Sequence, residues 1–100
     1  MAGMVFEWDE AKSRRTLSER GFGFDHAARI FYGPTPEKED DRRNYGGVRM
    51  QAIGESGGDV LFVVYTDRGD VRHIISARLA GRKERRLWQS FAEQRKASAG

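Results

Sequence analysis

A hydrophobic hairpin in the second half of the chain constrains the fold more than any other feature of the sequence. Its first strand is the run Val60–Thr66, which is rich in β-branched and aromatic side chains. The segment Asp67–Asp70 has the composition of a turn, and Val71–Ala77 is typical of a second strand. Because strands joined by so short a turn pair antiparallel, the chain is expected to contain an antiparallel sheet.

The segments around this hairpin predict the element order β-α-α-β-β-β-α. They are a strand over residues 5–8, helices over 10–20 and from about 26 to 32, a strand over 48–53, and a final helix over 82–94. Asp9 and Gly21 are suitable residues to begin and end the first helix. Helices gathered on one face of an antiparallel sheet make an α+β fold.

The length of the chain allows one domain over its 100 residues. Residues 1–4 and 96–100 are expected to be frayed, because they lack a hydrophobic pattern. Residues 35–44 contain an acidic run and a proline, which predicts a solvated loop.

Alternation along the hairpin assigns its side chains to two faces of the sheet. If Asp67 pairs with Asp70, one face is nearly all apolar and is expected to pack under the helices. That face carries Val60, Phe62, Val64, His73, Ile75 and Ala77. The other face carries Leu61, Val63, Tyr65, Arg72, Ile74, Ser76 and Arg78. A bulge at Gly69 would shift the pairing by one residue and invalidate this assignment.

The charge balance weakly favours a polyanionic partner. Lys and Arg total 18 against 15 for Asp and Glu, and the basic residues crowd the C-terminal quarter of the chain. On the mixed face, Arg72 and Arg78 could hold phosphate groups by two hydrogen bonds each. Ordinary exposed arginines are the alternative interpretation of the same pattern.

Several classes of site are excluded or disfavoured. The chain has no Cys, which rules out disulfides, thiolate catalysis and Cys-based zinc sites. Its two histidines are too far apart in the sequence to predict a metal site; His73 is typical of a core residue and His26 of a surface residue. The N-terminus does not resemble a signal peptide and no apolar run is long enough to span a membrane, so the cytoplasm is the expected location.

Five segments of the sequence resemble the BrnT family of ribonuclease toxins. They are Phe6–Lys12 (FEWDxxK in the family), the spaced residues of Gly21–Phe31 (GxxFxxAxxxF), Ile53-Gly54 (IG), Ile74–Arg78 (IISAR) and Arg82–Arg85 (RxER). The resemblance extends from about Val5 to Trp88. FEWD and IISAR at this separation form a specific pair of motifs.

The resemblance implies a RelE-like fold and the toxin of a type II toxin–antitoxin pair. Such a toxin would be a metal-independent endoribonuclease without a cofactor, and it would inhibit translation and growth. Its partners would be RNA and a cognate DNA-binding antitoxin of the BrnA kind, and operator DNA would be bound only through the complex. The rival interpretation is a basic module that holds an acidic protein or RNA without catalysis.

Metal-free RNA cleavage needs groups that move protons and groups that stabilise the phosphate. The expected catalytic residues are Arg72 and Arg78 as phosphate clamps, His73 as acid or base, and Lys12. Expected RNA-binding residues are Tyr65, Ser76, Arg82 and Arg85.

This sequence departs from the family pattern at a few positions, which are Thr16, Arg20, His73, Gly81 and Trp88. The family usually has His at position 20 and Tyr at position 88. An indole cannot transfer protons as a phenol can, so these two changes favour the rival interpretation.

Overall fold

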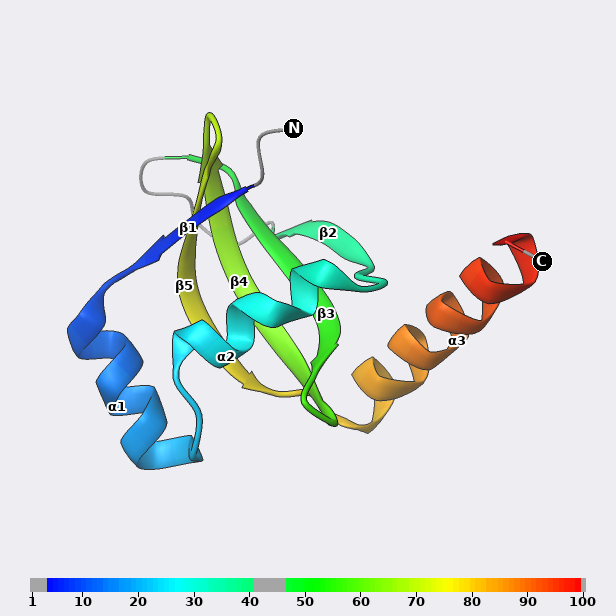
Figure 1. The fold of residues 1–100 in the computed structure, drawn as a ribbon, viewed down its shortest axis with the longest axis horizontal. Coiled ribbons are helices and arrows are strands. Elements are labelled where there is room, and N and C mark those ends of the chain that lie inside the picture. Colours follow the sequence, from blue (N-terminus) through cyan, green and yellow to red (C-terminus); the bar gives the residue numbers. More distant parts are fainter. Residues whose placement is uncertain (1–3, 41–46, 100) are drawn as a thin grey trace.

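The structure, a computed structural model, describes residues 4–40 and 47–99 (Figure 1). Its elements are β1 (Val5–Trp8), α1 (Glu10–Arg20), α2 (Phe24–Ala28), the 3₁₀ helix η1 (Arg29–Tyr32), β2 (Glu37–Asp40), β3 (Arg49–Ser56), β4 (Asp59–Arg68), β5 (Val71–Leu79) and α3 (Arg82–Ala99). The predicted α+β class is confirmed. Among the described residues, no helix is long and apolar enough to cross a membrane.

The strands form a single sheet in the order β1-β5-β4-β3-β2. Strands β3, β4 and β5 pair antiparallel, as expected. Strand β2 pairs antiparallel with β3, and β1 pairs parallel with β5. Helix α1 follows β1 directly and lies along the same margin of the sheet, where it contacts β5 (Figure 1). This position lets side chains of α1 reach the margin of either face.

We predicted a loop over residues 35–44, but Glu37–Asp40 form strand β2, so the prediction was wrong for these residues. Strand β2 pairs with β3 at the outer edge of the sheet, with Glu37 opposite Ala52 and Asp40 opposite Arg49. Its sequence, Glu-Lys-Glu-Asp, has no apolar residue, and charged side chains are common on edge strands. Residues 41–44 of the predicted loop lie outside the described residues.

The hairpin has a different register from the predicted one. Arg68 pairs with Val71, so the turn is the two-residue Gly69-Asp70. Gly69 has φ +60°, which suits the first position of a tight hairpin turn. Asp67 therefore pairs with Arg72 instead of with Asp70.

A β-bulge at Ile75 changes the faces of the second strand. Tyr65 pairs with Ile74 and Val64 pairs with Ser76, which leaves Ile75 without a partner across the ladder. Side-chain alternation restarts after such an extra residue. Arg72 therefore shares a face with Tyr65, whereas Ser76 and Arg78 share the opposite face with Val64 and Phe62.

The helices pack on the face that was expected to be the mixed, polar one, so the predicted assignment of faces was wrong. We call this the helix face. Its core is formed by Leu61, Val63, Tyr65, Ile74 and Ala77 of the hairpin with Phe22, Phe24, Ala27, Ala28, Ile30 and Ala52. The opposite side, the far face, carries Gln51, Phe62, Val64, Thr66, His73, Ser76 and Arg78.

The ends of α1 confirm their predicted caps. The Asp9 carboxylate accepts hydrogen bonds from the backbone N–H groups of Ala11 and Lys12, at 2.9 and 3.2 Å. Gly21 ends the helix with φ +88°, a conformation that glycine adopts without strain. The second predicted helix is shorter than expected, since its last turn, Arg29–Tyr32, is a 3₁₀ helix.

Helix α3 is longer than predicted and continues past Gln94 to Ala99, well away from the sheet (Figure 1). The Glu84 carboxylate accepts from the Gly81 backbone N–H at 2.7 Å, which caps the first turn. The Trp88 indole N–H donates to the Pro34 carbonyl at 2.9 Å and ties the helix to the segment before β2. Of the predicted frayed ends, residues 1–3 and 100 lie outside the described residues.

His26 is not the surface residue that the sequence suggested. Its Nδ1 lies 3.2 Å from the Ser56 hydroxyl and its Nε2 lies 3.6 Å from the Asp59 carboxylate. The side chain is 27% exposed. The imidazole thus connects α2 to the turn between β3 and β4 and has a structural place in the fold.

Candidate functional site

A cavity at one end of the far face gathers basic side chains from four elements, and we call it the basic pocket. It has a volume of about 210 Å³ and is lined by Lys12, Gly47, Arg49, Thr66, Arg68, His73 and Ile75. Lys12 comes from the first turn of α1, and the other charged residues come from β3, β4 and β5. The fold therefore brings together Lys12 and His73, two residues that sequence analysis singled out separately.

His73 lies on the far face and is not the core residue that its apolar neighbours suggested. Its side chain is 35% exposed, and its Nδ1 lies 3.8 Å from the Glu7 carboxylate. The parallel register of β1 and β5 places Glu7 directly beside His73. A carboxylate beside Nδ1 orients the ring and leaves Nε2 as the nitrogen that can exchange a proton with another molecule.

The three permanent cations of the basic pocket are unpaired within the described part of the chain. Lys12, Arg49 and Arg68 form no ion pair with any side chain of residues 4–40 and 47–99. Their charges add at one place, which attracts anions from solution. The hydroxyl of Thr66 donates to the Val48 carbonyl at 2.8 Å and fixes the strand beside them.

Sequence analysis missed Arg49 and Arg68. Arg68 lies two residues after Thr66 on the same strand, so alternation along β4 could have placed it on the far face once the strand was extended to its true end. Arg49 lies in the predicted strand over residues 48–53, but its face could not be assigned, because the register of that strand against its neighbour was not predicted.

A second cavity adjoins the basic pocket on the far face, and we call it the central hollow. It has a volume of about 480 Å³ and is lined by Arg20, Asp40, Gln51, Phe62, Val64, Ser76, Ala77, Arg78 and Glu84. Two more residues from the sequence analysis, Ser76 and Arg78, thus lie on the same face as His73. Arg20, which replaces the usual histidine of the family pattern, also reaches this hollow.

Arg78 is engaged by an internal carboxylate. Its two terminal nitrogens donate to the two oxygens of Glu84, both at 2.8 Å, and its guanidinium carbon lies 4.1 Å from the centre of the Phe62 ring. The hydrogen bonds from Arg78 hold the pKa of the Glu84 carboxyl below its usual value. Arg78 therefore braces the junction between β5 and α3 through Glu84.

Arg72 and Tyr65 lie on the helix face, away from both cavities. The Arg72 guanidinium carbon is 4.1 Å from the centre of the Tyr65 ring and 4.6 Å from that of Phe31. Its nitrogens donate to the Asp67 carboxylate at 2.8 and 2.9 Å, and Glu37 lies 3.5 Å away. Arg72 and Arg78, expected to form one clamp on one face, are therefore separated by the sheet.

The Tyr65 hydroxyl donates to the Glu37 carboxylate, and the Tyr65 ring contacts Phe31 of η1. The residue is 1% exposed, and burial, followed by this hydrogen bond, raises the pKa of its phenol above the usual value. Such a phenol stays protonated and shielded from solvent. The Tyr65 side chain therefore stabilises the core and does not reach a surface ligand.

The remaining candidates from the sequence lie on α3. Arg85 donates to the Ala80 carbonyl at 3.0 Å, and Arg82 is exposed beside it. Neither lines the basic pocket or the central hollow. Residues 4–40 and 47–99 contain no group of three or more His, Asp or Glu side chains arranged to hold a metal ion.

Comparison with known protein families finds a match over most of the chain. Residues 8–84 match the family described as ribonuclease toxin, BrnT, of type II toxin–antitoxin system. The matched segment includes every residue that lines the basic pocket and the central hollow. Comparison with curated proteins finds no significant match.

Proposed function

The chain belongs to the BrnT family of ribonuclease toxins of type II toxin–antitoxin systems, and we propose that it cleaves RNA in the basic pocket of the far face. The observation that carries this proposal is the convergence of one imidazole and three unpaired cations, which are His73, Lys12, Arg49 and Arg68. We assign the fold to the RelE-like group on the resemblance of its motifs. The reaction that we propose needs no metal ion.

His73 is the proposed proton acceptor. Its Nε2 takes the proton of a ribose 2′-hydroxyl, and the freed oxygen attacks the adjacent phosphorus. The bond from phosphorus to the 5′-oxygen breaks, and that oxygen takes a proton from the ammonium group of Lys12. The products are a 2′,3′-cyclic phosphate and a new 5′-hydroxyl, so atoms and protons balance.

Arg49 and Arg68 supply the electrostatic part of the mechanism. Negative charge grows on the phosphate oxygens as the fifth bond to phosphorus forms, and preorganised guanidinium groups stabilise it. Because the two arginines come from neighbouring antiparallel strands, the sheet holds them in place before substrate arrives. No ion pair within the described residues has to break first.

An RNA cleavage assay on the purified protein tests this function. We expect cleavage to proceed equally with and without EDTA and to yield cyclic phosphate ends. Loss of cleavage in EDTA, with recovery on adding a divalent cation, would contradict the metal-free mechanism. RNA binding without cleavage under both conditions would favour the rival interpretation of a non-catalytic binding module, which the engagement of Arg72 and Arg78 by internal carboxylates also supports.

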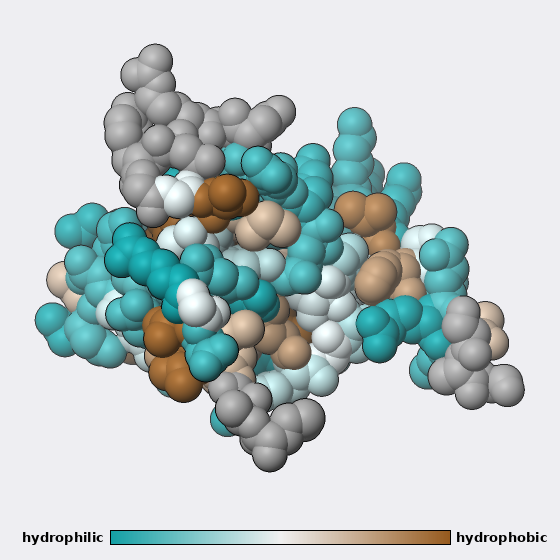
Figure 2. Space-filling view, turned by 90° about the horizontal axis from the view of Figure 1, so that it is seen from above, coloured by the Kyte–Doolittle hydropathy of each residue, from teal (hydrophilic) through white to brown (hydrophobic). Residues whose placement is uncertain are grey.

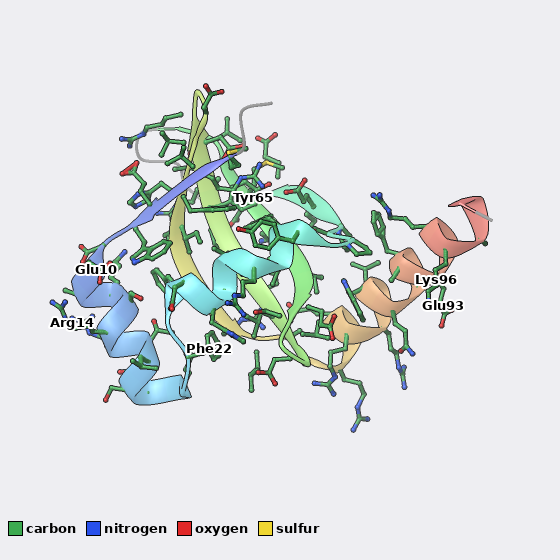
Figure 3. All side chains as sticks on the ribbon, viewed as in Figure 1. Glu10, Arg14, Phe22, Tyr65, Glu93 and Lys96 are labelled. Atoms are coloured by element: carbon green, nitrogen blue, oxygen red, sulfur yellow. The ribbon has the colours of Figure 1, made fainter. Side chains whose placement is uncertain are left out.

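We also propose a DNA-binding antitoxin of the BrnA kind as the partner that neutralises the toxin. Helix α3 carries six basic residues against two acidic ones, which are Arg82, Lys83, Arg85, Arg86, Arg95 and Lys96 against Glu84 and Glu93. Its distal half, with Glu93 and Lys96, projects from the body (Figure 3). Hydrophobic surface lies among hydrophilic residues where the helix leaves the sheet (Figure 2).

Co-expression with the product of the neighbouring gene tests the partner. We expect a stable complex that suppresses growth inhibition and binds operator DNA, whereas the toxin alone does not bind that DNA. Because a toxin that inhibits translation has to act where ribosomes are, we propose the cytoplasm as its location. A neighbouring product that binds only at very low salt would remove the support for this pairing.

A further inference from the structure

The central hollow offers hydrogen-bonding groups that the proposed cleavage reaction does not use. The Gln51 amide and the Ser76 hydroxyl line it, and neither makes a side-chain hydrogen bond within the described residues. Phe62 and Val64 form its apolar floor. A cavity of about 480 Å³ has the size of a small-molecule site, and its lining combines an apolar floor with polar and charged walls.

The hollow lies next to the basic pocket on the same strands. On β3, Gln51 of the hollow follows Arg49 of the pocket by two residues; on β4, Val64 precedes Thr66 by two. Two residues along a strand span roughly 6.6 Å and return to the same face. A nucleotide whose phosphate occupies the basic pocket therefore has the hollow within reach of its base.

Arg78 gives the hollow a planar wall. Glu84 fixes the guanidinium plane through two hydrogen bonds, and the Phe62 ring lies 4.1 Å from the guanidinium carbon. The side chain is 44% exposed. Unpaired RNA bases stack on aromatic rings and on arginine planes, and each such contact strengthens binding.

We propose that the central hollow is a nucleobase subsite that selects bases with an exocyclic amino group. This rests on the proposed function, since the base belongs to the nucleotide beside the cleaved phosphate. The Glu84 carboxylate already accepts from Arg78 and Gly81, so the acceptor that the hollow offers to a base is the side-chain carbonyl of Gln51, which matches an amino donor. Adenine, cytosine and guanine carry such a donor, whereas uracil does not.

Cleavage-site sequencing on a random RNA pool tests the selection. In the wild type, we expect uracil to be depleted at one position next to the cut. Gln51→Leu removes the amide with little change in volume, and it should reduce that depletion by about tenfold. Gln89→Leu, the same change on the exposed side of α3, should leave the base profile as it is. An unchanged profile in Gln51→Leu would overturn the proposal.

A titration without cleavage separates the subsite from the catalytic proposal. In NMR spectra of the wild type, AMP, CMP and GMP should move the Gln51 side-chain amide resonances, and UMP should move them less. Ser76→Ala, at an exposed position, should weaken this response without unfolding the protein. If the protein cuts no RNA but the resonances move, the function fails and the subsite stands. If it cuts RNA and no nucleotide moves them, the subsite fails and the function stands.

Discussion

The two faces of the sheet hold their arginines in opposite ways. On the helix face, Arg72 is 14% exposed and lies between two aromatic rings and two carboxylates. On the far face, Arg49 and Arg68 form no ion pair within the described residues. The first arrangement uses the charge to hold strands and η1 together, and the second leaves it available to an anion. Pairing and burial therefore separate the structural from the functional guanidinium.

Arg78 lies between these two extremes. It is on the far face with the unpaired cations, yet its guanidinium is paired with Glu84 as firmly as Arg72 is paired with Asp67. Its greater exposure, 44% against 14%, keeps one part of the group open to solvent. We therefore assign Arg78 to the wall of the central hollow and the phosphate-stabilising role to Arg49 and Arg68.

Replacing His73 should have the largest effect on function. His73→Gln keeps much of the size and polarity of the side chain but removes the ring nitrogen that would accept the proton of the 2′-hydroxyl. We expect RNA cleavage to fall by about 10²–10⁴-fold, the usual loss for a general base. Thermal unfolding should show a melting temperature close to that of the wild type. Wild-type cleavage by this variant would contradict the role of His73.

Replacing Arg72 should have the largest effect on stability. Arg72→Ala leaves the partly exposed carboxylates of Asp67 and Glu37 without their cation and removes the guanidinium from the Tyr65 and Phe31 rings, which together cost about 2–3 kcal/mol. For a domain of this size, the melting temperature should fall by about 10 °C or more. Arg68→Ala is the matched control and should change stability by less than about 0.5 kcal/mol. Similar melting temperatures for both variants would mean that the two faces do not differ as we argue.

The sequence predicted the parts of the fold that depend on local signals. The carboxylate of Asp9 and the conformation of Gly21 set the ends of α1, and both residue types have strong positional preferences at helix ends. The apolar runs that became β4 and β5 identified the central hairpin. Each of these features depends on residues close together in the chain.

The sequence could not predict which side chains of β5 lie on which face of the sheet, because the bulge at Ile75 decides this. The run Val71–Leu79 holds two polar residues followed by two apolar ones, Arg72-His73-Ile74-Ile75, and this pattern does not show which of them is the extra residue of a bulge. The bulge depends on how β5 fits against β4, which is a tertiary property. It moved Arg72 away from Arg78, and it brought Ser76 and Arg78 to the side where Lys12 and His73 lie.

The sequence also did not predict the edge strand β2 or the partners of the Glu37 and Glu84 carboxylates. Glu37 belongs to an acidic run that reads as a solvated loop, yet in the fold it accepts a hydrogen bond from the Tyr65 hydroxyl. Its partner is far away in the chain, so no local pattern links them. Glu84, by contrast, lies three residues after Gly81, a spacing typical of a helix cap, although its bond to Arg78 was not foreseen.

Arg49 and Arg68 should affect RNA cleavage and not the fold. Replacing either by Ala should lower kcat/KM by about tenfold, since each supplies part of the charge that stabilises the phosphate. The loss should shrink as salt is added, because ions screen exposed charges. Lys83→Ala on α3 is the control for a general loss of positive charge. An equal loss in that variant would show that the pocket has no special role.

The smallest predicted effect concerns the pH dependence of the Arg78–Glu84 pair. The pKa of Glu84 is lower in the folded protein than in the unfolded chain, chiefly because Arg78 donates to its ionised form. The stability that this pair contributes is therefore fully present above the unfolded pKa, near 4.5, and is lost as the pH falls through the folded value. Because the Arg78 side chain is 44% exposed, solvent screens the pair, and its contribution at neutral pH should be below about 1 kcal/mol. Glu84→Gln should lower the melting temperature slightly at pH 7, and the difference from the wild type should close as the pH is lowered from 5 to 3. A difference that stays constant over this range would mean that Glu84 acts through its cap on Gly81, which a glutamine side chain can partly replace, and not through its charge on Arg78.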